Sequence, residues 1–124
     1  MMTNSEDMKA LNREILLAFW KVHILHHAAE GPVIGQWMLK ELRRHGYDVS
    51  PGTLYPMLQR MEGNGWLRSE ADPKRGPRAP RKYYLTEKGE EVLALIGRQV
   101  RELYEEIGRP DTCPNASEEK KKHE

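Results

Sequence analysis

The residues that end and begin helices are the feature that most constrains the fold of this chain. Gly31-Pro32 must end a helix, because proline cannot continue one and restricts the residue before it. Ser50-Pro51 favours a new start, with a serine side chain that can cap backbone N–H groups and a proline suited to the first helical position. Gly46 and Gly65 are typical helix ends. These signals predict three helices in the first half of the chain.

The first predicted helix, about residues 8–29, is apolar on nearly every side through its middle, ILLAFWKVHIL. A helix of this kind must be buried on more than one side. One small domain can cover only one of those sides, so we expect a second copy of the chain to cover another. Residues spaced alternately by three and four form the expected interface on this helix: Leu11, Ile15, Ala18, Val22 and Leu25.

The second and third helices are shorter and amphipathic. Residues 34–45 are expected to turn Ile34, Trp37, Met38 and Leu42 inward. Residues 51–64 are expected to bury one apolar face and to expose a polar one. The apolar face is Leu54, Met57, Leu58 and Met61.

After Gly65 the pattern changes to two short strands, residues 66–71 and 82–85. The connection DPKRGPRAPRK is basic and rich in proline, so the two strands are predicted to form a hairpin with a basic tip. Tyr83 and Tyr84 alternate across the second strand, so one is expected in the core and the other outside it.

The last predicted helix is residues 87–107, with Thr86 as its cap. Its apolar residues again step by three and four, the spacing of a helix that pairs with another helix. They complete the expected dimer interface: Leu93, Ile96, Val100, Leu103 and Ile107. We therefore predict one domain over residues 1–107, followed by a polar and disordered tail at 108–124.

The net charge of +1 conceals a segregation of charge. Residues 31–86 hold ten Lys and Arg against five Asp and Glu, a net charge of +5, which suits contact with a polyanion. Three helices, a basic hairpin and a closing helix give a mainly α fold with a small β-hairpin, a winged helix-turn-helix with N- and C-terminal dimerisation helices. In this fold the third helix enters the major groove of DNA.

Two stretches, SPGTLYPMLQRMEGNGWL and PRKYYLTEKGEEVL, resemble the central signature of PadR-family transcriptional regulators. The resemblance extends over residues 15–103. It implies a homodimeric repressor that often answers to a small hydrophobic or aromatic effector, and we place Trp20 at the effector pocket. Carried onto this sequence, the DNA contacts are Ser50, Gly52, Thr53, Tyr55, Gln59, Arg60, Lys74, Arg75, Arg78, Arg81 and Lys82. Two such readers would recognise a near-palindromic operator.

Other functions receive little support from the sequence. No nucleophile motif or phosphate-binding loop is present, so we expect no enzyme activity and no cofactor. His23 and His27 have a chelating spacing beside His26, but no Cys, Asp or Glu completes a cluster in sequence, so we expect no metal site there. Cys113 has no cysteine partner, and the lack of an apolar span or leader indicates a cytoplasmic protein. Two alternatives stay open: a winged helix that binds a protein partner, and a DNA-binding regulator without a ligand.

Overall fold

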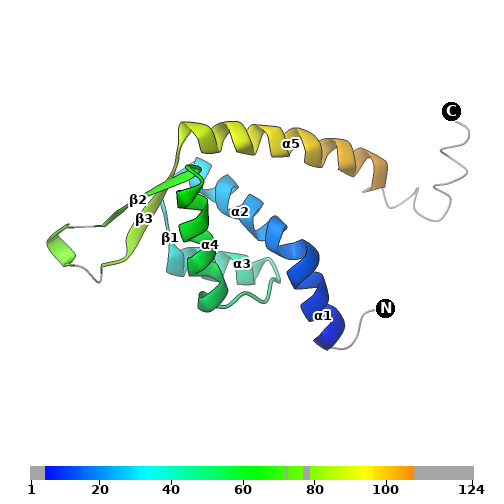
Figure 1. Ribbon diagram of the computed structural model, residues 1–124, viewed down its shortest axis with the longest axis horizontal. Helices are drawn as coiled ribbons and strands as arrows, with labels where there is room; N and C mark the ends of the chain where they lie inside the picture. The colour runs from blue at the N-terminus through cyan, green and yellow to red at the C-terminus, as the bar shows by residue number, and fades with distance from the viewer. Residues whose placement is uncertain (1–4, 72, 77–78, 108–124) are drawn as a thin grey trace, which may run out of the picture. The chain divides into compact units, whose positions relative to one another are not determined.

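The computed structural model describes residues 5–71, 73–76 and 79–107 (Figure 1). It begins with three consecutive helical segments, α1 (Ser5–Leu11), η1 (Asn12–Leu16) and α2 (Leu17–Glu30). The middle segment is a π-helix, in which the N–H of Leu17 reaches the carbonyl of Asn12. Such a turn is wider than an α-helical turn and changes the phase of the side chains on its two sides. The prediction of one regular helix over residues 8–29 is therefore right in extent and wrong about this turn.

The chain then forms β1 (Val33–Ile34) and α3 (Gly35–Arg44), within one residue of the predicted helix at both ends. The strand was not predicted, because two residues are too few to show an alternating pattern. Trp37 was expected to point inward, but it is 44 % exposed. Met38 and Leu42 lie one turn apart and fill the core, so Trp37 is rotated away from it.

Helix α4 (Pro51–Gly63) has its predicted bounds to within one residue. Its four predicted core residues, Leu54, Met57, Leu58 and Met61, are all at most 1 % exposed. The predicted side-chain cap is wrong: the Ser50 hydroxyl donates to Thr53 Oγ1 at 3.3 Å, and it is the Ser50 carbonyl that accepts from the N–H of Leu54. Pro56 lies inside this helix.

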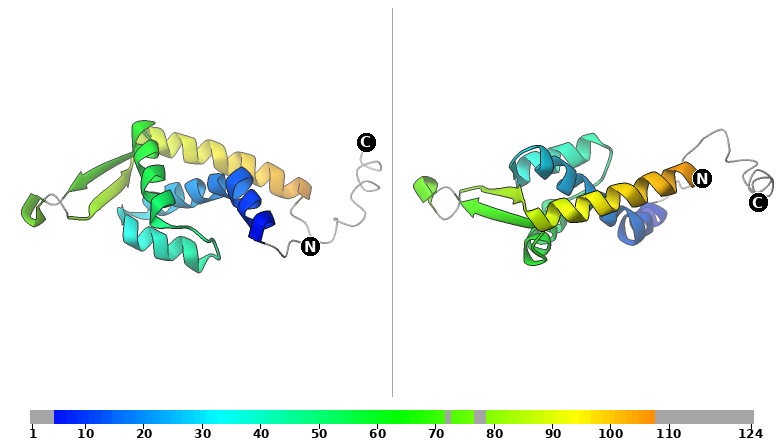
Figure 2. Two further views of the ribbon diagram at one scale, coloured as in Figure 1. Left: turned by 60° about the horizontal axis from the view of Figure 1, so that its bottom comes forward. Right: turned by 90° about the horizontal axis from the view of Figure 1, so that it is seen from above.

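The strands β2 (Leu67–Ala71) and β3 (Arg81–Leu85) pair in antiparallel fashion, and the 3₁₀ turn η2 (Pro73–Arg75) lies between them. This hairpin projects from the end of α4 (Figure 1, Figure 2). β1 pairs with the free edge of β3, so the predicted two-stranded hairpin is part of a three-stranded sheet of order β1-β3-β2. As predicted, the two tyrosines divide: Tyr83 is buried, and Tyr84 is half-buried on the other face beneath the Arg68 guanidinium.

Helix α5 (Glu87–Ile107) has the predicted bounds, and the Thr86 hydroxyl accepts from the N–H of Gly89 at 2.9 Å, as predicted. The Thr86 hydroxyl also donates to the carbonyl of Gly65, which ties the start of α5 to the end of α4. The chain forms two compact units, Met1–Leu93 and Ala94–Glu124, and α5 contributes to both. Among the described residues, no helix is long and apolar enough to cross a membrane.

Candidate nucleic-acid interface

The polar face of α4 lies on the surface of the first unit, opposite the apolar face that fills the core. Thr53 is half-buried, and the other predicted contacts on or next to this helix are exposed: Ser50, Gly52, Tyr55, Gln59 and Arg60. In the first turn of α4, Pro51 has no N–H and the N–H groups of Thr53 and Leu54 donate to the Ser50 carbonyl, so the N–H of Gly52 is the group that suits a phosphate oxygen. The structure thus presents together the α4 residues that the sequence predicts for DNA contact.

Tyr55 packs against a glycine of the preceding helix. A Cβ atom built at Gly35 would lie 2.9 Å from the Tyr55 hydroxyl and closer still to its ring. The Tyr55 ring thus lies directly against the backbone of α3 at Gly35, and a larger residue at position 35 would have to displace the ring. Sequence reasoning missed Gly35, since a glycine in the first turn of a helix has no special meaning without its neighbour.

A concave surface lies between α3, α4 and β3 and encloses a volume of about 350 Å³. From the predicted set it brings together Tyr55, Gln59 and Arg81, and it adds Gln36 from α3. Amide and guanidinium groups are the side chains that most often read base edges in the major groove. Gln36 is therefore a candidate contact that the sequence did not indicate.

The hairpin carries the remaining predicted contacts. Lys74, Arg75 and Lys82 are exposed, whereas Arg78 lies outside the described residues. Arg81 is positioned by a small network. Its Nε donates to the Ser69 hydroxyl at 2.9 Å, and the N–H and hydroxyl of Ser69 each donate to the Glu62 carboxylate of α4 at 2.9 Å. These bonds join the base of the hairpin to α4.

The residues predicted for a dimer interface differ in exposure. Ile15 is 51 % exposed, and Val100, Leu103 and Ile107 are 52–60 % exposed. Ala18 is exposed, while the following are half-buried: Leu11, Val22, Leu93 and Ile96. Leu25 is 1 % exposed, so it belongs to the core of this chain rather than to a surface. The apolar surface that is available for a dimer interface therefore does not include Leu25.

Trp20, predicted at an effector pocket, is 2 % exposed and packs in the same core, with its ring centroid 5.8 Å from that of Tyr47. Its indole Nε1 is buried and has no hydrogen-bond partner among the described residues. A buried N–H group without an acceptor is costly.

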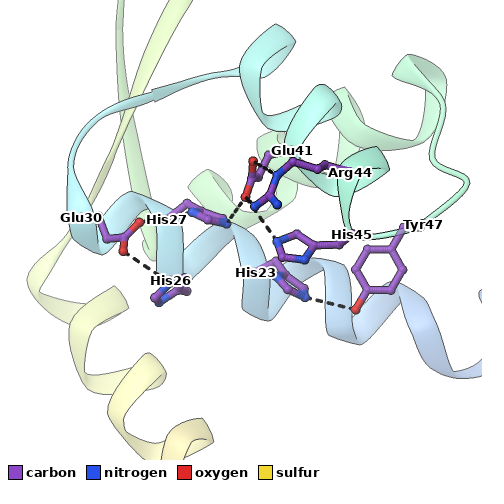
Figure 3. A network of polar contacts seen from close by, with 8 residues as sticks. All are labelled: His23, His26, His27, Glu30, Glu41, Arg44, His45 and Tyr47. Carbon is purple, nitrogen blue, oxygen red and sulfur yellow. Dashed lines mark hydrogen bonds and ion pairs between the residues drawn. The ribbon is translucent and has the colours of Figure 1, made fainter.

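A cluster of histidines lies on the side of α2 that faces α3 (Figure 3). His23 and His27 come from α2, and His45 directly follows α3; the centroids of the His23 and His45 rings are 4.6 Å apart. Burial, and next the neighbouring His45 and His27, lower the pKa of His23 below its usual value of 6.5, which favours its neutral form.

Glu41 of α3 faces the same cluster. Its Oε2 lies 3.4 Å from His27 Nε2 and 3.2 Å from His45 Nε2. Both carboxylate oxygens also accept from Arg44, at 2.6 and 3.1 Å. The hydrogen bond from Arg44 is the main cause that lowers the pKa of Glu41 to about 2, so this carboxylate is ionised at neutral pH.

Comparison with known proteins decides the family of this chain. Residues 24–95 match the family model described as the transcriptional regulator PadR-like family, and this match extends over more than half of the chain. The chain belongs to the PadR-like family of transcriptional regulators. This PadR-like protein is thus a member of a DNA-binding regulator family, whose members are not enzymes.

Individual relatives agree with this assignment. The PadR-like protein is 46 % identical over 107 residues to the transcriptional regulator Rv3488 of Mycobacterium tuberculosis, with 85 % of this chain and 99 % of the relative covered. It is 27 % identical to a PadR family regulator of Eggerthella lenta with a TM-score of 0.65, covering 85 % and 88 % of the two chains. A Streptococcus transcriptional regulator gives the same identity and TM-score, covering 77 % and 94 %. The predicted winged helix-turn-helix fold is confirmed.

Proposed function

We propose that this PadR-like protein is a repressor that binds a near-palindromic operator as a homodimer. Each α4 would enter a major groove while the basic hairpin contacts the adjacent backbone or minor groove. The observation that carries this proposal is the concave surface on which α4 and the hairpin present Tyr55, Gln59 and Arg81 side by side. A repressor of this kind would act by occupying DNA that RNA polymerase needs.

Different residues would contribute in different ways. Tyr55, Gln59 and Thr53 are our candidates for base edges, because they lie on the exposed or half-exposed face of α4. Arg60, Lys74, Arg75, Arg81 and Lys82 would mainly contact phosphate groups. Phosphate contacts set the salt dependence of affinity more than the choice of sequence.

The test is DNA affinity as a function of salt. In fluorescence anisotropy with DNA from upstream of its own gene, we expect R60A, R75A and R81A together to weaken binding at every salt concentration. They should also reduce the slope of log K against log salt by about 2 to 3, since each phosphate contact contributes about 0.9. The control K9A, R13A removes two exposed cations of α1 and η1 and should leave the slope unchanged. An unchanged slope in the triple variant would mean that the assigned face is wrong.

Dimerisation is supported by apolar residues that remain exposed, one on η1 and several at helical spacing on α5. Ile15, Val100, Leu103 and Ile107 are each at least half exposed. Such a seam on a helix is typical of a helix that pairs with another one. The second copy would place the two α4 helices about 34 Å apart, one turn of DNA.

The effector part of the proposal depends on Trp20. Its unpartnered Nε1 would provide a donor for a small aromatic or hydrophobic ligand with an acceptor atom. In the variant W37F, W66F only Trp20 reports by fluorescence, and we expect quenching by members of a panel of aromatic compounds. Absence of quenching across the panel would favour a regulator controlled by its abundance or by a partner protein.

A further inference from the structure

Three imidazole groups from two separate parts of the chain lie together (Figure 3). His23 and His27 are one turn apart on α2, and His45 stands at the end of α3. One nitrogen from each of the three residues lies within 4.8 Å of the others. Gly46 has a φ of +94°, so the backbone can turn directly after His45 and leave it beside α2.

The hydrogen bonds within the protein do not account for this cluster. The side chain of His27 is 10 % exposed, and its Nε2 is buried without a hydrogen bond to any described residue. Glu41 Oε2 lies 3.4 Å from this nitrogen, and that carboxylate also accepts from Arg44. Other ring nitrogens of the cluster have partners: His23 Nε2 lies 3.1 Å from the Tyr47 hydroxyl, His27 Nδ1 lies 3.3 Å from Glu30 Oε1, and His45 Nε2 lies 3.2 Å from Glu41 Oε2. A buried ring nitrogen that makes no hydrogen bond and lies beside two further imidazoles points to a ligand.

We propose that His23, His27 and His45 bind a divalent transition-metal ion of the zinc type. Neutral imidazole is a preferred ligand of Zn²⁺, and three protein ligands leave one tetrahedral position for water. Zn–N bonds of about 2.0–2.1 Å require ligand nitrogens about 3.4 Å apart, so the rings would close by small rotations. The ionised Glu41, whose Oε2 lies 3.4 Å from His27 Nε2 and 3.2 Å from His45 Nε2, would offset part of the charge of the cation.

The metal would connect α2 to the residue that follows α3, in addition to the contacts of His27 with Glu41 and of His23 with Tyr47. Two ligands lie on α2 and the third directly follows α3, and α3 packs against α4. Because the ion binds only the folded arrangement, its binding should raise the thermal midpoint of unfolding.

A second set of donors, His26, His27 and Glu30, lies nearby on α2 alone. His26 and Glu30 have side chains that are 57 % and 64 % exposed, so a metal there would have to order two solvated groups. This set would also use no residue of α3. The two sets share only His27, which means that His45 and His26 distinguish them.

The test uses the full chain without an affinity tag, because tag histidines bind the same metals. Zn²⁺ affinity is measured by competition with a chromophoric chelator. We expect H45Q to weaken binding by roughly tenfold or more, and H26Q to leave it within about twofold. His45 is the ligand of choice for substitution since its side chain is 34 % exposed, and far-UV circular dichroism checks that H45Q folds.

Co²⁺ provides an independent readout of the ligands. The bound ion should show visible d–d bands of low coordination number and no thiolate charge-transfer band, because all ligands are nitrogen or oxygen. H45Q should lose these bands. The proposal would be overturned if H45Q bound Zn²⁺ with unchanged affinity. It would also be overturned if H26Q lost Zn²⁺ affinity while H45Q kept it. A thiolate band would do the same, by assigning the metal to Cys113.

Discussion

The apolar faces of α4 and α5 differ sharply in how far this chain covers them. On α4, Leu54, Met57, Leu58 and Met61 are at most 1 % exposed, so the chain itself completes that core. On the distal part of α5, Val100, Leu103 and Ile107 are 52–60 % exposed. The same spacing of apolar residues is therefore buried on one helix and exposed on the distal part of the other. One helix is stabilised within the subunit, and the other is left with a surface that another molecule can bury.

The largest expected effect is in the core under α4. Leu58 is 0 % exposed, so L58A should lower the free energy of unfolding by about 2–5 kcal/mol through lost burial and a cavity. Urea denaturation measures it. The matched variant L103A on α5 should lower the free energy of unfolding far less, when it is measured at a protein concentration at which the chain is monomeric. Equal losses would mean that α5 is covered within the subunit.

The next effect concerns assembly. V100D, L103D should raise the dimer dissociation constant by roughly a hundredfold or more, because two apolar side chains per subunit lose their burial. Sedimentation velocity over a range of concentrations gives the value. The control R98D places an aspartate on the opposite face of α5 and should change the dimer dissociation constant little. If the wild-type chain sediments as a monomer at all concentrations, the proposed interface is wrong.

A smaller effect should come from Gly35. G35A would force the Tyr55 ring away from α3, and we expect a loss of about 1–3 kcal/mol in stability together with weaker DNA binding. In contrast, a Cβ at Gly97 of α5 meets nothing within 4 Å, so G97A should stabilise the chain by about 0.5–1 kcal/mol. Thermal melts of both variants compare the two helices directly. A neutral G35A would show that the contact with Tyr55 is not tight.

The smallest effect is a dependence of stability on pH. The lowered pKa of His23 means that the unfolded chain takes up a proton at higher pH than the folded one. Stability is therefore full above pH 6.5 and should fall as the pH decreases through the folded pKa. Glu41 adds a second loss, which begins below its ordinary pKa of 4.5 and continues to about 2. The loss of stability between pH 7.5 and 5.5, measured by urea midpoints, should be smaller in H23Q than in the wild-type chain.

Local signals in the sequence predict the elements of this fold well. Proline at Gly31-Pro32 and Ser50-Pro51, and the cap at Thr86, fix helix ends through the backbone of a few neighbouring residues. The helix bounds in the structure follow these positions to within about one residue. The π turn at residues 12–16 was not predicted, because it has no local signal of this kind.

The candidate sites depend more on contacts between distant residues. The exposed face of α4 could be predicted, since helical periodicity separates it from the core. The contact of Gly35 with Tyr55 and the approach of His45 to His23 join residues about twenty positions apart. Periodicity carries no information about such pairs. The sequence for this reason indicated two chelating histidines and no third ligand.

The central claim is that two α4 helices read successive major grooves, and hydroxyl-radical footprinting tests it most directly. The DNA would first be selected as the fragment that the protein retains from its own genome. We predict protection in two regions that are about one helical turn, roughly 34 Å, apart and related by approximate two-fold symmetry. One protected region without a symmetric second, at saturating protein, would contradict it.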